Sequence, residues 1–284
     1  MVIKHGQIDK PMDNRNYKLK VALISDIHVG YDSWGNYDKL NNIFKHISNS
    51  DVDFVISMGD ELDSGYARTP ELMAEQLAQL NTSLQYLDKP LFKVKGNHDD
   101  SVNTFTEFGT IICNGVKFIC IWPKYIGMTA DEIDGSSQYS SRGELTTDDI
   151  AWIESELESC GSNIPIIISH YAVHTRQKVS GKTFIWPICD TVTDMNGNTH
   201  DGHRDELLAL CSTYSVPLFL NGHEHRSGLI HDTVDDLDME NVQIASLTSH
   251  YVEMTVYDTG FQLKEMNTTD FTQTATLTLG TIPS

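Results

Sequence analysis

The sequence lacks a hydrophobic run long enough to cross a membrane. None of its apolar stretches approaches the roughly 20 residues of a transmembrane helix. Residues 1–16 carry charges and contain no apolar core of a signal peptide. We therefore expect a soluble, cytoplasmic protein with no membrane partner.

Basic residues are scarce as well. The 284 residues include 20 lysines and arginines against 40 aspartates and glutamates, which gives a formal net charge of −20. Such a charge opposes binding to nucleic acid and to anionic membranes. A nucleic-acid polymer is therefore not an expected partner.

Cysteine is sparse, with five residues and no Cys-x-x-Cys pair. This usage fits a reducing compartment and argues against a structural zinc site. The dipeptide Asn114-Gly115 predicts a two-residue hairpin turn in which Cys113 pairs with Val116. That register would keep Cys113 and Cys120 apart, so they would not form a disulfide.

What the sequence does contain is a series of short apolar runs typical of strands buried on both faces. Five of them lie at 19–25, 52–58, 91–95, 164–169 and 216–220. Three further candidate strands follow at 242–247, 251–257 and 274–279, and they imply a second sheet.

Helical patterns alternate with these runs. They predict helices at 37–48, 70–87, 147–159 and 203–213. Thr69 is the expected N-cap of the second helix, with Pro70 at its first position, and Thr146 with Asp149 predicts a capping box on the third. The chain length fits a single α/β domain over residues 1–284, with a core at 17–260 and peripheral segments at 1–16 and 265–284.

A polar motif directly follows each of the first five runs. Carboxyl ends of strands meet at one edge of an open α/β sheet, so motifs that are distant in sequence would converge on one crevice. Taken singly these motifs are weak signals, and their ordered set is the informative feature. They are Asp26-Ile27-His28, Gly59-Asp60, Gly96-Asn97-His98-Asp99, His170 and Gly222-His223-Glu224-His225.

The residue types in these motifs suit a pair of transition metals. Carboxylate oxygen and imidazole nitrogen favour Mn, Fe, Co, Ni or Zn in divalent or trivalent form, whereas an all-oxygen cage favours Ca or Mg. Residues two apart, such as Asp26 and His28, share one face of an extended strand and can reach one centre. Two ions about 3.5 to 4 Å apart can clamp an in-line displacement and generate hydroxide. Asp60, which follows a glycine, is the natural bridging carboxylate.

In this order, over residues 26–225, the motifs resemble those of the calcineurin-like metallophosphoesterase superfamily. The resemblance implies a four-layer α/β/β/α sandwich in which two mixed sheets pack face to face between helices. It also implies two sets of metal ligands that share one carboxylate. The first set is Asp26, His28, Asp60 and His225, and the second is Asp60, Asn97, His170 and His223.

The same resemblance assigns His98 a catalytic role in place of a ligand role. It would protonate the leaving oxygen, and Asp99 would orient its imidazole. Ser64 stands where phosphoprotein phosphatases carry a phosphate-gripping arginine, in a block that reads Gly-Asp-Glu-Leu-Asp-Ser-Gly from Gly59. Asp63 stands where purple acid phosphatases carry a tyrosine. The remaining likeness is to the bacterial phosphodiesterase branch, although nucleases share its third motif.

We therefore expect a phosphodiesterase acting on a small phosphoester, nucleotides included. A phosphomonoesterase acting on a small metabolite is the alternative. A non-catalytic metal-bound interaction module is a third class, and the intact ligand set with His98 argues against it. The sequence specifies neither the metal nor the oligomeric state.

One segment departs from the acidic composition. Residues 171–189 contain three basic residues and no acidic one. Because the segment follows His170, it either overhangs the metals and attracts an anionic substrate or forms an ordinary solvated loop. The candidate substrate contacts are Asn97, His174, Arg176, Lys178 and Lys182.

Overall fold

The structure is a computed structural model of the 284-residue chain. The described residues are 6–8, 16–30, 34, 37–63, 69–99, 108–133, 136–173, 177–179, 182–184, 188–194, 196–225, 229–233, 237 and 239–280. Side chains are described for these residues except 6–8, 127–133, 136–141, 177–179, 182–184, 192 and 230–233.

Two large mixed sheets form the centre of the fold. The six-stranded sheet runs from edge to edge as β19 (Gln273–Gly280), β18 (Gly260–Asn267), β17 (His250–Val256), β2 (Leu19–Ile24), β3 (Phe54–Ser57) and β4 (Leu91–Lys93). Its β2, β3 and β4 strands are parallel, and β17, β18 and β19 pair antiparallel beside β2.

The seven-stranded sheet runs as β1 (Gly6–Ile8), β5 (Gly109–Cys113), β6 (Val116–Cys120), β9 (Ile164–Ile168), β14 (Leu218–Asn221), β16 (Glu240–Gln243) and β15 (Ile230–Thr233). Strands β6, β9, β14 and β16 are parallel. The turn at Asn114-Gly115 joins β5 to β6 and pairs Cys113 with Val116, which confirms the predicted hairpin.

Among the described residues, four α-helices cover the two sheets: α1 (Asp38–Asn49), α2 (Pro70–Leu84), α3 (Thr147–Glu158) and α4 (Arg204–Thr213). The predicted caps are confirmed, because the Thr69 side chain accepts the amide of Leu72 and the capping box of Thr146 and Asp149 is present. Helix α2 ends three residues earlier than predicted. No helix in the described part of the chain is long and apolar enough to cross a membrane.

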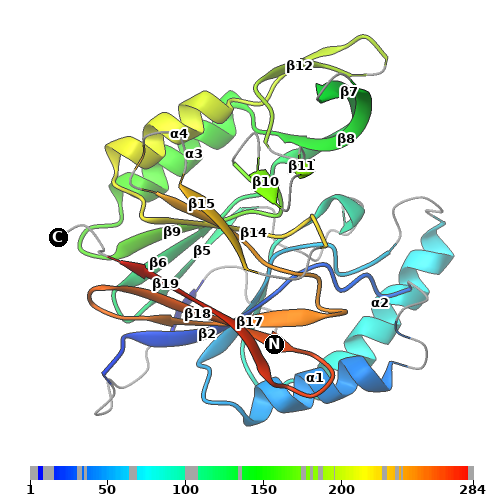
Figure 1. Cartoon of the computed structure of the whole chain (residues 1–284), viewed down its shortest axis with the longest axis vertical. Coiled ribbons are helices and arrows are strands. Elements are labelled where there is room, and N and C mark those ends of the chain that lie inside the picture. The colour runs from blue at the N-terminus through cyan, green and yellow to red at the C-terminus, as the bar shows by residue number, and fades with distance from the viewer. Residues whose placement is uncertain are drawn as a thin grey trace.

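Three apolar clusters show that the fold has four layers. The first fills the space between the sheets, where Phe54 of one sheet meets Phe118 of the other edge-on at 5.8 Å. The second lies between the six-stranded sheet and α1 and α2, and the third between the seven-stranded sheet and α3 and α4. Figure 1 shows the two helix pairs on opposite sides of the sheets. The predicted α/β/β/α sandwich is therefore correct.

Three two-stranded hairpins lie beside the sandwich on the α3 and α4 side (Figure 1). They are β7 (Lys124–Ile133) with β8 (Ser136–Glu144), β10 (Gln177–Val179) with β11 (Lys182–Phe184), and β12 (Thr191–Thr193) with β13 (Thr199–Asp201). None of the three follows from the sequence patterns.

Two further boundaries differ from the expected ones. The strand predicted at 242–247 ends at Gln243, because the chain then leaves the sheet and passes the end of β2, where the Leu247 amide donates to the carbonyl of Ser25. The core also continues past residue 260, since Leu263 and Leu279 are buried between the sheets. Residues 265–280 therefore contribute strands to the six-stranded sheet.

Candidate dinuclear metal centre

The five motifs meet where strands of both sheets end. Three follow the parallel strands β2, β3 and β4, and two follow β9 and β14. Their side chains are buried, except that His98 is partly exposed and the side chain of His225 is 49% exposed. The convergence predicted for these motifs is therefore correct.

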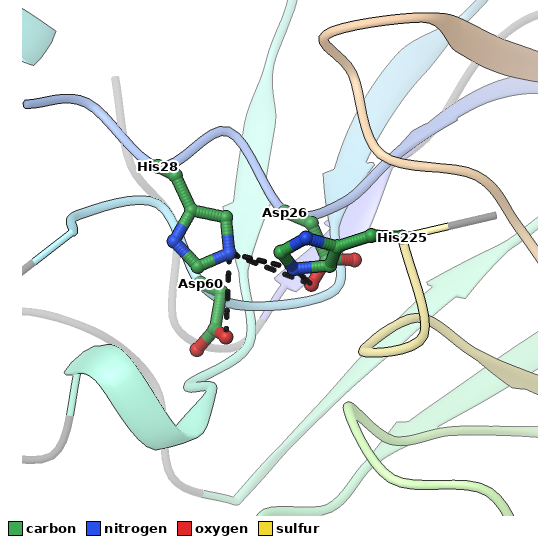
Figure 2. A group of neighbouring side chains, drawn as sticks. All are labelled: Asp26, His28, Asp60 and His225. Carbon is green, nitrogen blue, oxygen red and sulfur yellow. Dashed lines mark hydrogen bonds and ion pairs between the residues drawn. The ribbon is translucent and has the colours of Figure 1, made fainter. Parts of the chain in front are cut away.

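Asp26, His28, Asp60 and His225 form one group of potential metal ligands (Figure 2). Nε2 of His28 lies 2.8 Å from Nε2 of His225, and that nitrogen lies 3.1 Å from Oδ1 of Asp26. Oδ2 of Asp60 lies 3.7 Å from Nε2 of His28. The four side chains thus point their coordinating atoms toward one point.

Asp60, His170 and His223 form a second group. Nε2 of His170 lies 3.2 Å from Oδ2 of Asp60 and 3.0 Å from Nδ1 of His223. The amide oxygen of Asn97 lies 3.1 Å from the same nitrogen. Asp60 therefore belongs to both groups, and the His-x-His pair is divided between them.

The distances between the coordinating atoms match those expected between ligands of one metal ion. Two ligands bound to one ion at about 2.1 Å and at right angles lie about 3.0 Å apart. Four pairs of coordinating atoms in the two groups lie 2.8 to 3.2 Å apart, and Oδ2 of Asp60 and Nε2 of His28 lie 3.7 Å apart, which corresponds to a wider angle at the ion. A mixed nitrogen and oxygen donor set suits a first-row transition metal. The site is therefore a paired His/Asp centre of the kind that holds two metals.

The backbone of the candidate ligands is unusual. A positive φ angle is uncommon outside glycine and costs free energy, and such residues cluster at functional sites. Five of the seven candidates have φ between 48° and 77°: Asp26, His28, Asp60, His223 and His225. Asp26 and His28 therefore reach one centre from a left-handed turn, and not from the extended strand that their spacing suggested.

Two glycines allow the motif loops to approach each other closely. A Cβ on Gly59, which has φ of 103°, would lie 2.7 Å from the backbone of Gly96 and 2.8 Å from the His170 ring. A Cβ on Gly96 would lie 2.1 Å from the Asp60 carboxylate. Glycine at both positions is thus a packing requirement of the site.

In the absence of metal, burial and neighbouring charges shift the pKa values of the two histidines in the second group. Burial lowers the pKa of His170, but the Asp60 and Asp26 carboxylates outweigh it and raise that pKa to about 9. Burial, and then the charge of His170, lower the pKa of His223 to about 3. Nδ1 of His170 lies 2.9 Å from the carbonyl of Met58 and must donate to it, which directs Nε2 to the centre.

Asp99 makes contacts that differ from the expected ones. Its carboxylate accepts the amides of Gly96, Glu61 and Leu62 at 3.1 to 3.3 Å. Burial, followed by the nearby Asp60 and Glu61 carboxylates, raises its pKa to about 7. Among the described residues Asp99 makes no hydrogen bond to the imidazole of His98. It instead joins the loop after β3 to the turn after β4.

Among the described residues, Asp63 supplies the carboxylate that lies beside Nδ1 of His98. Its Oδ1 lies 3.8 Å from Nδ1 of His98 and 3.3 Å from Nδ1 of His28. These three residues also form a possible metal group. However, a neutral His28 that binds a metal through Nε2 carries its proton on Nδ1, so Asp63 is better suited to accept a hydrogen bond. Sequence reasoning missed this contact, although the block Gly-Asp-x-x-Asp contained Asp63.

Nε2 of His98 lies 4.0 Å from Oδ2 of Asp60, so the imidazole stands beside the paired centre. Its ring meets the His28 ring edge-on at 4.7 Å. His98 belongs to neither of the two groups that share Asp60. Burial lowers the pKa of its imidazole.

A second residue that sequence reasoning missed is Tyr171, which is fully buried behind the second group. Its ring centroid lies 4.7 Å from that of His223 and 5.5 Å from that of His170. A Cβ on Gly143 of β8 would lie 2.8 Å from the Tyr171 ring. The hairpin β7–β8 therefore supports the ring that packs against two candidate ligands.

We expect Gly143→Ala to weaken metal binding, because the added methyl group would lie 2.6 Å from Pro123 and 2.8 Å from the Tyr171 ring, and this ring packs against the imidazoles. Changes behind metal ligands typically cost about 10- to 100-fold in affinity. Calorimetric metal titration measures this loss. Gly280→Ala is the control, since a Cβ there meets nothing within 4 Å. Equal affinities for the two variants would contradict the supporting role.

None of the expected substrate contacts is tested, including that of Asn97. His174 and Arg176 lie outside the described residues. Lys178 and Lys182 lie in the hairpin β10–β11, where the structure describes the backbone pairing and not the side chains. Their contact with substrate stays a prediction.

The fold and the site together define a metal-dependent phosphoesterase. Residues 19–227 match the calcineurin-like phosphoesterase family, and the chain belongs to that family. A relative from Arcobacter nitrofigilis, described as a probable glycerophosphodiester phosphodiesterase GpdQ, is 24% identical over 218 residues, which cover 72% of this chain and 71% of the relative.

Solved structures share the fold. A dimetal phosphatase from Danio rerio superposes with a TM-score of 0.68 at 14% identity, over 94% of this chain and all of the other. GAP50, the anchor in the inner membrane complex of Plasmodium, superposes with a TM-score of 0.56 at 13% identity, over 94% and 90% of the two chains. At these identities the likeness concerns the fold alone.

Proposed function

We propose that this protein is a phosphodiesterase that hydrolyses small phosphoesters, nucleotides included. The proposal rests on the paired His/Asp centre with His98 beside it. The relative described as a probable glycerophosphodiester phosphodiesterase supports a diester substrate.

Seven residues would hold the two metals, with the Asp60 carboxylate between them. When bound, the metals supply Lewis-acid activation of the phosphoryl group and of a water molecule. The protein fixes the ligands through the tight turns after β2, β3 and β14 and through the contact of His170 with the Met58 carbonyl. The proposed ligands are Asp26, His28, Asp60, Asn97, His170, His223 and His225.

His98 is the proposed general acid. Asp63 faces its Nδ1 atom, so the transferable proton of the imidazolium sits on Nε2, which is directed toward Asp60 and the metal centre. Asp63 would therefore take the orienting role that the family resemblance assigned to Asp99. A general acid at this place protonates the leaving oxygen of an ester.

Charge favours a diester over a monoester. A phosphodiester carries one negative charge at neutral pH, whereas a monoester carries about 1.5 to 2. A protein with a formal charge of −20 repels the dianion more strongly, and a polymer more strongly still. Ser64 also replaces the arginine that grips a phosphate dianion in phosphoprotein phosphatases.

The test compares bis(4-nitrophenyl) phosphate with 4-nitrophenyl phosphate, because the two esters share a leaving group. The protein is first reconstituted with Mn, Fe, Co, Ni or Zn, and kcat/KM is measured for both esters. We expect a larger kcat/KM for the diester. Glycerophosphodiesters, cyclic nucleotides and duplex DNA then rank the natural substrate classes.

A higher kcat/KM for the monoester would contradict the proposal and favour a phosphomonoesterase. No turnover with any metal, in protein that nevertheless binds two ions per chain, would favour the non-catalytic module. Faster cleavage of duplex DNA than of small diesters would identify a nuclease.

A further inference from the structure

Strand β19 leaves a long sheet edge open. An exposed edge presents a row of backbone donors and acceptors that can pair with another chain, and proteins usually protect it with shortness, charge, proline or a bulge. In the described part of the chain, no strand pairs with the outer side of β19. Thr274, Thr276 and Thr278 are exposed along it.

The other three outer strands are protected in the usual ways. Strands β1 and β4 have three residues each, and β15 has four, including Asp232. Strand β19 has eight residues and contains neither a charged residue nor a proline. The irregular pairing with β18 lies at Glu265/Met266, which leaves a regular run from Ala275 to Gly280.

The two faces of this run differ in a way that suits pairing with itself. Leu277 and Leu279 pack toward the core between the sheets, whereas Thr276 and Thr278 are exposed on the other face. In an antiparallel pair about a two-fold axis at Leu277, Thr276 of each copy lies opposite Thr278 of the other. Threonine opposite threonine is a favourable cross-strand pair. The leucines of both copies then lie on the same face of the joined sheet.

The acidic charge of the protein also favours an uncharged strand as the contact between two copies. Each copy carries a formal charge of −20, so contact through an acidic surface would bring like charges together. Strand β19 is an uncharged strip in this acidic protein. A second copy presents the same neutral strip, as a two-fold interface requires.

We propose that two copies of this protein dimerise by antiparallel pairing of β19 with β19, which joins two six-stranded sheets into one of twelve strands. The contact is small for a stable interface, so the dimer forms with a Kd on the order of micromolar. Because salt screens the repulsion between the two acidic copies, the dimer tightens as ionic strength rises.

The test is sedimentation equilibrium of the metal-loaded protein at 1 to ~200 µM chain concentration, in low and moderate salt. The wild-type protein should dimerise, and more tightly at the higher salt. The double variant Thr276→Lys/Thr278→Lys places lysine opposite lysine twice, which should raise the Kd about tenfold or more. Thr276→Lys/Thr278→Glu places lysine opposite glutamate and should dimerise as well as the wild type.

The first double variant changes the formal charge from −20 to −18, which by itself would favour association. Weaker dimerisation of this variant would therefore result from the lysine pairs across β19, and not from its net charge. Asn81→Lys/Gln85→Lys makes the same charge change on the exposed side of α2 and should leave the dimer intact. Circular dichroism and thermal unfolding check that each variant is folded.

A wild-type protein that stays monomeric throughout would overturn the proposal. So would a Thr276→Lys/Thr278→Lys variant that dimerises like the wild type. Loss of the dimer in Thr276→Lys/Thr278→Glu would overturn the register with Leu277 on the axis.

Discussion

Asp60→Ala is expected to reduce the metal content from about two ions per chain to one or fewer, and activity to background. In the part of the chain that the structure describes, Asp60 is the one residue shared by the two ligand groups. Its Oδ2 lies 3.2 Å from His170 in one group and 3.7 Å from His28 in the other. Removal of this carboxylate leaves the second group with two imidazoles and the Asn97 amide, a neutral set that binds a cation more weakly, whereas the first group keeps one carboxylate and two imidazoles.

Elemental analysis of protein reconstituted with excess metal measures the effect. Asp53→Ala is a matched control, because Asp53 is also buried and stands at the opposite end of β3, where its carboxylate accepts the amide of Lys20. Both variants lose a buried hydrogen-bonding carboxylate and some stability. Only Asp60→Ala should lose metal. Retention of two ions per chain in Asp60→Ala would show that Asp60 is not the bridging ligand.

The candidate ligands could be predicted from the sequence because the place of each in the fold follows from its position just after a strand. A polar residue directly after a buried parallel strand must emerge at the carboxyl edge of the sheet, whatever the rest of the chain does. Asp26, Asp60 and His170 all follow this rule. The family resemblance then supplied the division of His223 and His225 between the two groups, which their spacing did not specify.

The contacts behind these ligands could not be predicted in the same way. Asp99 is next to His98 in sequence, yet its side chain turns to the amides of the β3 loop, and Asp63 from that loop reaches the imidazole. Which carboxylate faces His98 depends on how two loops from neighbouring strands pack. Tyr171 packs against His223, and Gly143 of β8, distant in sequence, leaves room for its ring.

The regions of the fold that were missed also lack a local signal. Hairpin β7–β8 is rich in Ser, Thr, Gly and charged residues and shows little apolar alternation. Strand β18 does alternate, with Phe261 and Leu263 buried, but the buried Glu265 interrupts the apolar pattern. Both elements owe their pairing to a neighbouring strand more than to the composition of the segment.

His98→Ala is expected to retain the metals and to lose about 10²- to 10⁴-fold in kcat, the usual contribution of a general acid. Its imidazole stands next to both groups without belonging to the set that shares Asp60. The Asp60 carboxylate accepts the amide of His98, a backbone contact that survives the loss of the side chain. The variant therefore separates proton transfer from metal binding.

A series of aryl phosphodiesters with leaving groups of increasing pKa gives the sharpest measurement. A good leaving group departs without protonation, so the loss in kcat should be smallest there and grow with the pKa of the leaving group. His46→Ala is the control, since His46 of α1 stacks on Phe271 and belongs to none of the ligand groups found among the described residues. Equal losses across the series would remove His98 from the acid role, and loss of metal in His98→Ala would make it a ligand.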